Sequence, residues 1–182
     1  MRTILITLFC FFIANISVNA QGKYATKSGE IDFEASVPSF EEVKANNKNV
    51  SAILTENGDF ASLALVNAFR FKVALMQEHF NENYAESDKY PKTTFRGKIN
   101  GYDFSELTDT ETTYNAVGVI TLHGVDKTVD APVQLKLVDD AIVLTTNFVL
   151  KPGDFDIEIP SIVSSKIAEE VNVSATFNLI KK

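Results

Sequence analysis

The sequence has few of the residues from which catalytic and metal centres are usually built. Only one of its 182 residues is cysteine and only two are histidine. Cys10 lies inside an apolar N-terminal segment, so the rest of the chain has no thiol for a disulfide, a nucleophile or a zinc ligand. Cysteine chemistry is therefore excluded from the part of the chain that follows this segment.

Basic residues are also scarce. Lysine and arginine number 17 against 24 aspartates and glutamates, which gives a formal net charge of −7 at pH 7. Nucleic acids and anionic membrane surfaces attract proteins through basic patches. We therefore expect no nucleic-acid partner and no attachment to a membrane by charge alone.

Motifs that carry chemistry are missing as well. The chain has no glycine-rich phosphate loop, no G-x-S-x-G nucleophile turn and no H-E-x-x-H zinc helix. His79 and Glu82 have a spacing that can share a metal on a helix, but two ligands make an incomplete site. We predict no catalytic residue, no metal site and no enzyme activity. The alternative is an enzyme that uses His79 with Glu78 and Glu82.

Acidic and apolar residues alternate in GDFDIEIP, residues 153–160. In an extended segment Asp154, Asp156 and Glu158 would share one face, where a pair of carboxylates can act as acid and base or hold Ca²⁺. The other face would be wholly apolar, which is the ordinary pattern of a strand with one solvated side. We interpret the segment as such a strand.

The N-terminus has the features of a cleavable export signal. A basic start precedes the apolar run 4–16, and Val18 and Ala20 place small side chains before the cleavage point. The apolar run is too short for a comfortable membrane span. We therefore expect a signal peptide at residues 1–20, a mature domain at residues 21–182, and no integral membrane span in the mature protein.

Apolar and polar residues alternate with a period of two over most of the mature chain. The alternating segments are residues 29–36, 50–56, 60–67, 93–101, 112–124, 127–138, 141–150 and 169–180. Asn57-Gly58 is a strong hairpin signal between the second and third segments, and Pro132 indicates an edge, a bulge or a strand end. We predict one mainly β domain of about eight antiparallel strands. The periodicity allows a sandwich or a barrel, and closure into a barrel would remove exposed edges.

Residues 71–87 interrupt this pattern. Leu75, Met76, Phe80 and Tyr84 recur at helical spacing, with His79 bordering their apolar stripe. Glutamates occupy the opposite face of the expected helix, and the proline at position 91 makes its continuation improbable. We predict a short helix that covers a barrel, and a second short helix near residues 161–169.

Three segments resemble the YceI-like proteins. In LMQEHFNENYAESDKYPKTTFRGKI, residues 75–99, a helix leads into a Tyr/Phe-Pro-x-Ala/Thr-x-Phe pattern, here from Tyr90 to Phe95. GVITLHGVDKTVDAPV, residues 118–133, is similar to the family's His-Gly-Val-x-Lys hairpin, and residues 148–160 are similar to its last strand and the segment after it. The N-terminal residues 23–47 depart from the family pattern, because they contain none of the histidines that many members have there.

The resemblance implies a lipocalin-like antiparallel β-barrel that encloses a polyisoprenoid, such as a quinone side chain, in an apolar tunnel. It also implies a periplasmic location and makes a homodimer reasonable. A fatty acid is a further ligand of the same apolar kind. The rival hypothesis is a structural or interaction protein with a filled barrel. The residues expected to line the ligand site are Phe33, Phe60, Leu63, Leu65, Phe71, Leu75, Met76, His79, Phe80, Tyr84, Phe95, Tyr114, Val119, Leu135, Phe148, Phe155 and Ile157.

Overall fold

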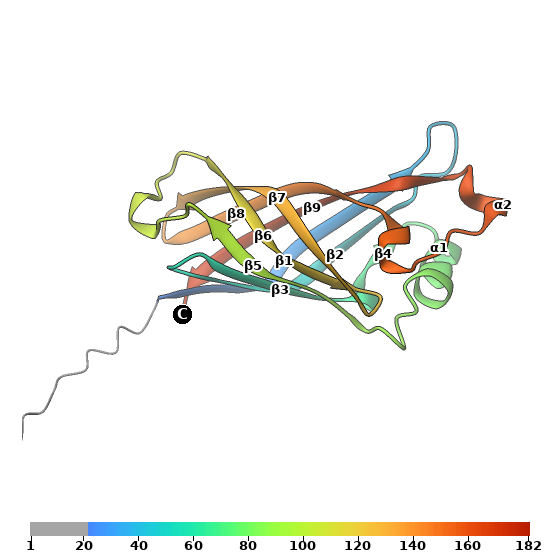
Figure 1. Ribbon diagram of the computed structural model, residues 1–182, viewed down its shortest axis with the longest axis horizontal. Coiled ribbons are helices and arrows are strands. Elements are labelled where there is room, and N and C mark those ends of the chain that lie inside the picture. Colours follow the sequence, from blue (N-terminus) through green and yellow to red (C-terminus); the bar gives the residue numbers. More distant parts are fainter. Residues whose placement is uncertain (1–21) are drawn as a thin grey trace, which may run out of the picture.

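A computed structural model describes residues 22–182, so the predicted signal peptide lies outside the described part of the chain. Nine strands form one antiparallel sheet in the order β1-β9-β8-β7-β6-β5-β3-β2-β4. Their bounds are Lys23–Ser36 (β1), Lys44–Thr55 (β2), Asp59–Leu65 (β3), Arg70–Phe71 (β4), Lys92–Asn100 (β5), Thr112–Leu122 (β6), Val125–Val138 (β7), Ala141–Leu150 (β8) and Ile167–Lys181 (β9). β1 also pairs with β2, which closes eight of the strands into a barrel, while β4 is an extra strand beside β2 (Figure 1). The predicted antiparallel barrel is confirmed.

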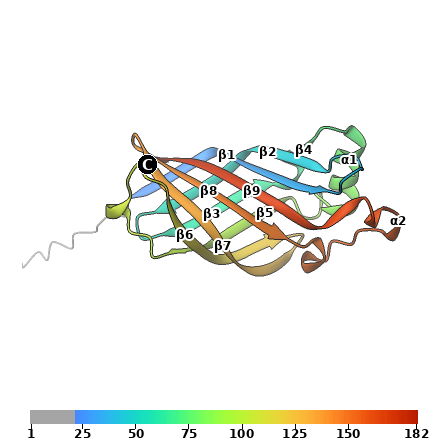
Figure 2. The ribbon, with the colours of Figure 1, turned by 90° about the horizontal axis from the view of Figure 1, so that it is seen from above.

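The helical segments lie at the two ends of the barrel. They are η1 (Val66–Ala68), α1 (Ala74–His79), the π-helical turn η2 (Phe80–Tyr84), η3 (Phe104–Glu106), η4 (Pro152–Phe155) and α2 (Ser161–Ser164). Figures 1 and 2 show α1 and α2 at one end, which we call the mouth, with η3 and the C-terminus at the other, which we call the closed end. Both predicted helices are confirmed, although α2 is only one turn long.

Turn and proline signals in the sequence agree with the strand pairing. Asn57-Gly58 joins β2 to β3 as a hairpin, with Gly58 at a φ of 87°. Pro132 lies where β7 leaves β8, because β7 pairs with β6 from Val125 to Leu135 but with β8 only from Val133 onward. Proline has no N–H to donate, so it fits the edge that β7 presents before that point.

Residues 153–160 are not the strand that their alternation predicts. They form most of the 3₁₀ turn η4 and then an irregular segment. Asp156 has a left-handed conformation, with a φ of 55°, directly after the turn. Such a residue interrupts the extended backbone that alternation needs. The expected exposure is nevertheless found, because the three carboxylates are exposed while Phe155 is buried.

Large aliphatic side chains fill the half of the barrel nearer the closed end. Those that are at most 1% exposed there are Leu54, Ile99, Leu135, Ile142, Leu144 and Leu179. Tyr24 and Phe104 cover this end, with their ring centroids 5.3 Å apart. Complete burial of a leucine or isoleucine side chain contributes about 1.5–3 kcal/mol, so this half supplies much of the stability of the fold.

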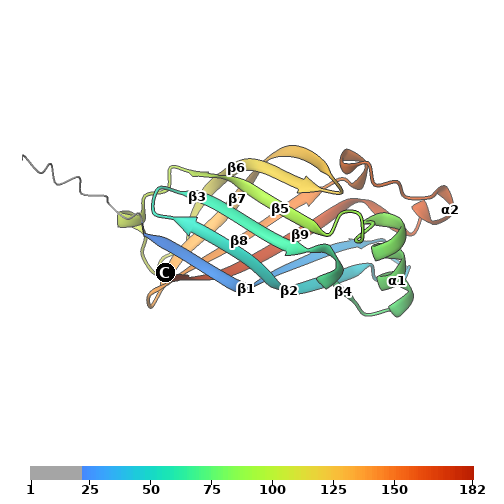
Figure 3. The ribbon, with the colours of Figure 1, turned by 90° about the horizontal axis from the view of Figure 1, so that it is seen from below.

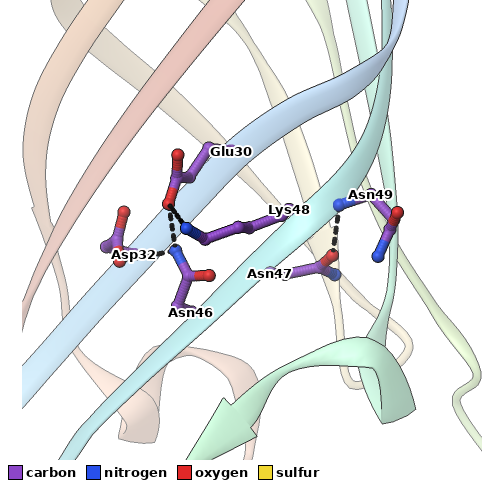
Figure 4. Close-up of polar contacts among 6 residues, drawn as sticks. All are labelled: Glu30, Asp32, Asn46, Asn47, Lys48 and Asn49. Carbon is purple, nitrogen blue, oxygen red and sulfur yellow. Dashed lines mark hydrogen bonds and ion pairs between the residues drawn. The ribbon is translucent and has the colours of Figure 1, made fainter.

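A buried amide accompanies a change of register between β1 and β2. The register shifts between Gly29 and Ile31, and opposite this point Asn47 of β2 is fully buried. Its Nδ2 donates to the Leu65 carbonyl at 3.1 Å, and its Oδ1 accepts the Asn49 N–H at 2.9 Å (Figure 4). The side chain thus supplies hydrogen bonds that regular strand pairing would have made.

We expect Asn47→Ala to lower the free energy of unfolding by about 1–3 kcal/mol, because two backbone groups lose their side-chain partner inside the barrel. Urea denaturation would measure the change. The matched control is Asn46→Ala, because Asn46 is partly exposed and donates to the carboxylates of Glu30 and Asp32 at 2.6 and 2.7 Å (Figure 4). A loss in the Asn46 variant as large as that in the Asn47 variant would contradict this account.

Candidate ligand cavity

The half of the barrel nearer the mouth is hollow. Its cavity has a volume of about 710 Å³ and is bounded by α1, η2 and η4 as well as by the strands. Small side chains face it: Ala64, Ala116, Ala131, Thr146 and Ala175. Ala116 is opposite Ala131, and Thr146 is opposite Ala175, on neighbouring strands. The cavity exists because these positions carry small residues where the closed end has leucine and isoleucine.

The cavity wall offers little hydrogen bonding. Most residues that line it are aliphatic or aromatic. Two lining threonines use their hydroxyls within the wall, since Thr146 donates to the Pro132 carbonyl at 2.7 Å and Thr93 to the Thr121 carbonyl at 3.0 Å. An occupant of the cavity would therefore be held mainly by apolar contact.

An aromatic cluster attaches the helical cover to the barrel. The ring centroid of Phe80, at the start of η2, lies 5.5 Å from Phe33, 6.1 Å from Phe69 and 5.1 Å from Phe71. The Gln77 side chain of α1 accepts the Phe71 N–H at 3.1 Å, which ties the helix to β4. Figure 3 shows α1 beside β4 at the mouth. The helical cover, α1 and η2, is thus attached to the barrel on the side of β1 and β4.

The rim of the mouth is exposed and partly polar. Leu75 and Phe40 line the cavity although they are 57% and 47% exposed. Glu41, His79 and Lys166 also reach the cavity from exposed positions. The cavity therefore opens to solvent here, and charged or polar groups are found where it opens.

His123 joins three separate segments near the mouth. Its Nε2 lies 2.7 Å from the Glu86 carboxylate, and its Nδ1 lies 3.0 Å from the Phe155 carbonyl. Both partners are hydrogen-bond acceptors, which a ring N–H of the imidazole can satisfy. The Tyr90 ring packs edge-on against the imidazole, with centroids 4.4 Å apart. His123 thus links the loop after η2, the β6–β7 hairpin and η4.

The contact between His123 and η4 lies beside a gap in the strand pairing of the barrel wall. β8 pairs with β7 only up to Thr146, and its last four residues pair with β9 alone. The Phe155 side chain of η4 is 1% exposed and lines the cavity, and η4 also contacts β7. Phe155 therefore fills the wall where β7 and β8 separate, and His123 holds it there.

Most of the predicted ligand-site residues do line the cavity. These are Phe33, Phe60, Phe71, Leu75, Met76, His79, Phe80, Tyr84, Phe95, Phe148, Phe155 and Ile157. They come from the wall, the helical cover and η4. The open lumen does not fit the rival hypothesis of a filled barrel.

Three predicted residues face away from the lumen. Leu65 and Val119 are 43% and 38% exposed, and Leu63 is partly exposed. Side chains alternate between the two faces of a strand, and the adjacent Ala64 and Ile120 line the cavity. The prediction was wrong for these three because it selected bulky residues without first assigning a face to each strand position.

Two further predicted residues point inward but lie too near the closed end. Leu135 is fully buried in the filled half. Tyr114 packs there against Tyr102, with ring centroids 6.0 Å apart. Burial raises the pKa of the Tyr102 hydroxyl. The prediction for Leu135 and Tyr114 was wrong because alternation gives the face but not the depth along the barrel.

Sequence reasoning missed the small lining residues and Phe177. Ala116, Ala131 and Ala175 belong to predicted alternating segments, and Phe177 is two residues after Ala175 on the same face. The available signal was alanine at inward positions where other strands carry leucine. Small inward residues mark a hollow lumen more directly than large ones do.

Neither clustered metal ligands nor a helix that could span a membrane is found among the described residues. Within residues 22–182, no three His, Asp or Glu side chains are grouped as metal ligands. In the same part of the chain, no helix has the length and apolar character that a bilayer crossing needs. His79 lies at the exposed rim, whereas Glu78 and Glu82 are exposed on the helical cover and do not line the cavity.

Comparison with known proteins gives a family and a set of similar folds. The family model for the YceI-like domain matches residues 10–179. No curated protein matched the chain. Three of the similar solved structures are 13–18% identical to this chain in sequence. Identity this low shows a similar fold alone.

The first of these is a polyisoprenoid-binding domain from Saccharophagus degradans implicated in plant cell wall breakdown. It has a TM-score of 0.77 and 13% identity over 89% of this chain and 99% of its own. Burkholderia cenocepacia BcnA has a TM-score of 0.69 and 17% identity over 83% of this chain and 95% of its own. The Campylobacter jejuni YCEI protein has a TM-score of 0.59 and 18% identity, over 78% and 88% of the two chains.

Proposed function

We propose that this chain, which belongs to the YceI-like family, encloses a polyisoprenoid or a similar long apolar chain in the hollow half of its barrel. The observation that carries the proposal is the apolar cavity of about 710 Å³. An isoprenoid or alkyl chain offers no hydrogen bonds, so its binding depends on burial of apolar surface. A wall that is mostly aliphatic and aromatic, with the Thr93 and Thr146 hydroxyls already paired, suits such a ligand.

The energetics agree with this choice of ligand. Burial of each methylene-sized group contributes about 0.8 kcal/mol, whereas association costs about 4–15 kcal/mol. A ligand of three or four isoprene units can therefore offset that cost without a polar anchor. The candidate ligands are an isoprenoid quinone, another polyisoprenoid or a fatty acid.

The polar end of the ligand would remain at the rim. Glu41, His79 and Lys166 are exposed there, whereas the deeper wall is apolar. Burial of a polar head group without partners is costly, so the apolar chain enters first. In this arrangement His79 contacts a ligand head group and performs no catalytic step.

The proposal includes export to the periplasm. It is supported by the basic start, the apolar run and the small residues before Gln21. A carrier for apolar molecules is useful in an aqueous compartment, where such molecules are poorly soluble. Whether the protein forms a homodimer stays a prediction.

Organic extraction of the protein from a bacterial periplasm tests both parts of the proposal. We expect mass spectrometry of the extract to find a prenyl lipid or a fatty acid at close to one per chain, and the protein to begin at Gln21. A periplasmic protein of the same size without a cavity, purified in parallel, gives the background. Extracts that repeatedly match this background would argue against lipid binding, and a retained N-terminal segment would argue against cleavage.

A further inference from the structure

Three phenylalanines form the floor of the cavity. Phe60 of β3, Phe95 of β5 and Phe177 of β9 all line it. The Phe60 ring lies 5.8 Å from the Phe95 ring and 5.6 Å from the Phe177 ring, centroid to centroid. β3 and β9 are not neighbours in the sheet, so the contact between Phe60 and Phe177 crosses the lumen.

Below this layer the barrel is full. Phe177 is opposite Leu144, and two residues further along β9 Leu179 is opposite Ile142. Leu144, Leu179 and Ile142 are all completely buried in the core, and none of them lines the cavity. An occupant that reaches the three rings therefore has no space beyond them.

Two of the rings pack against glycine residues of the neighbouring backbone. A Cβ at Gly29 would lie 2.4 Å from the Phe177 ring, so this ring rests directly on the backbone of β1. A Cβ at Gly97 or at Gly118 would lie 2.7 Å from Cζ of Phe95. Gly97 and Gly118 are direct partners on β5 and β6. Each ring thus occupies a gap that only glycine leaves, and the level of the floor follows from the sequence.

We propose that this floor, made of Phe60, Phe95 and Phe177, limits the length of the bound chain to about 20–25 carbons. The estimate takes the cavity of about 710 Å³ and roughly 30 Å³ for each carbon-sized group, the share of one water molecule in the liquid. Longer chains leave their remaining units outside the mouth, in water. The inference rests on the proposed function, because it specifies which members of the ligand class fit.

The experiment loads the purified protein with an equimolar mixture of all-trans prenyl alcohols from C10 to C50 in detergent. After removal of the detergent, native mass spectrometry measures which lengths stay bound. We expect occupancy to be greatest at C20–C25 and at least about tenfold lower at C40 and above. A longer chain must move its remaining units from the detergent micelle into water when it binds, and this loss of apolar burial costs free energy. Equal retention of C40–C50 chains would overturn the length limit.

Variants of the floor test which residues set this limit. Phe177→Ala removes six ring carbons, so the preferred length should increase by about one five-carbon unit; Phe177→Leu, which keeps more of the packing, is the substitute if the alanine variant does not fold. Gly29→Ala forces the Phe177 ring upward and should decrease the preferred length. Leu65→Ala, on the outer face of β3, the strand that carries Phe60, is the matched control and should leave the preferred length unchanged.

The outcomes separate this inference from the proposed function. If the wild-type protein retains no chain of any length, the proposed function fails. If it retains C20–C25 chains but both floor variants keep the wild-type preference, lipid binding stands and the floor does not set the length. Opposite shifts in the Phe177 and Gly29 variants would support the inference.

Discussion

Replacing Ala131 by phenylalanine is expected to lower the affinity for a long apolar chain by about a hundredfold or more, which corresponds to roughly 2.8 kcal/mol. Ala131 faces the lumen from β7, opposite Ala116, in the part of the wall where small residues adjoin. A phenyl group there occupies the lumen between the mouth and the floor. Loss of contact with only four methylene-sized groups would already account for an effect of this size.

The same substitution should not destabilise the fold. Enlarging a residue in a well-packed core usually costs about 1–3 kcal/mol, but at Ala131 the added ring enters empty space. We therefore expect an unchanged or higher midpoint of thermal unfolding together with the loss of binding. This combination distinguishes a filled cavity from a damaged barrel.

Ala61→Phe is the matched control. Ala61 lies on β3 between two residues that line the cavity, so its side chain is on the outer face. Displacement of a fluorescent fatty acid would report binding in both variants. Equal affinity of the Ala131 variant and the control would mean that the ligand does not occupy the lumen.

His123→Ala is expected to lower the free energy of unfolding by about 1.5–3 kcal/mol, the range for a hydrogen bond that involves a charged group. The imidazole side chain is only 10% exposed, and it bonds the Glu86 carboxylate and the Phe155 carbonyl. Its removal leaves both acceptors without this donor. We also expect faster amide hydrogen exchange in η4, because Phe155 loses its attachment to the hairpin.

The other histidine provides the control for this variant. His79 is exposed at the rim, so His79→Ala should change stability by no more than about 0.5 kcal/mol. Urea denaturation and hydrogen exchange with mass spectrometry would measure both variants. If exchange in η4 is the same with and without the His123 imidazole, then His123 does not hold Phe155 in the wall.

Local sequence patterns were sufficient to locate the eight barrel strands and the helical cover, although they missed β4 and the first halves of β1 and β2. Alternation over residues 141–150 predicts β8 with its observed bounds, and Asn57-Gly58 predicts the β2–β3 hairpin. Both signals depend on residues close together in the chain. The failure at residues 153–160 has a local cause as well, because the left-handed residue Asp156 interrupts an otherwise regular alternation.

The role of His123 could not be obtained in the same way. His79 is the histidine that sequence patterns single out, because it borders a helical stripe, whereas the buried hydrogen bonds belong to His123. Its partners Glu86 and Phe155 are 37 and 32 residues away in the chain. Nothing in the sequence near any of the three indicates that they meet.

The sequence by itself determined that this chain forms antiparallel strands with one apolar face and a short helical cover, since alternation and helical periodicity assign a face to each residue; periodicity left open whether the strands form a sandwich or a barrel. Tertiary structure decided how deep along the barrel each inward residue lies. Leu135 and Ala131 share a face of β7, yet one fills the closed end and the other borders the cavity. Depth follows from the stagger of strands that pair across the whole chain and close into a ring, and local periodicity carries no information about that stagger.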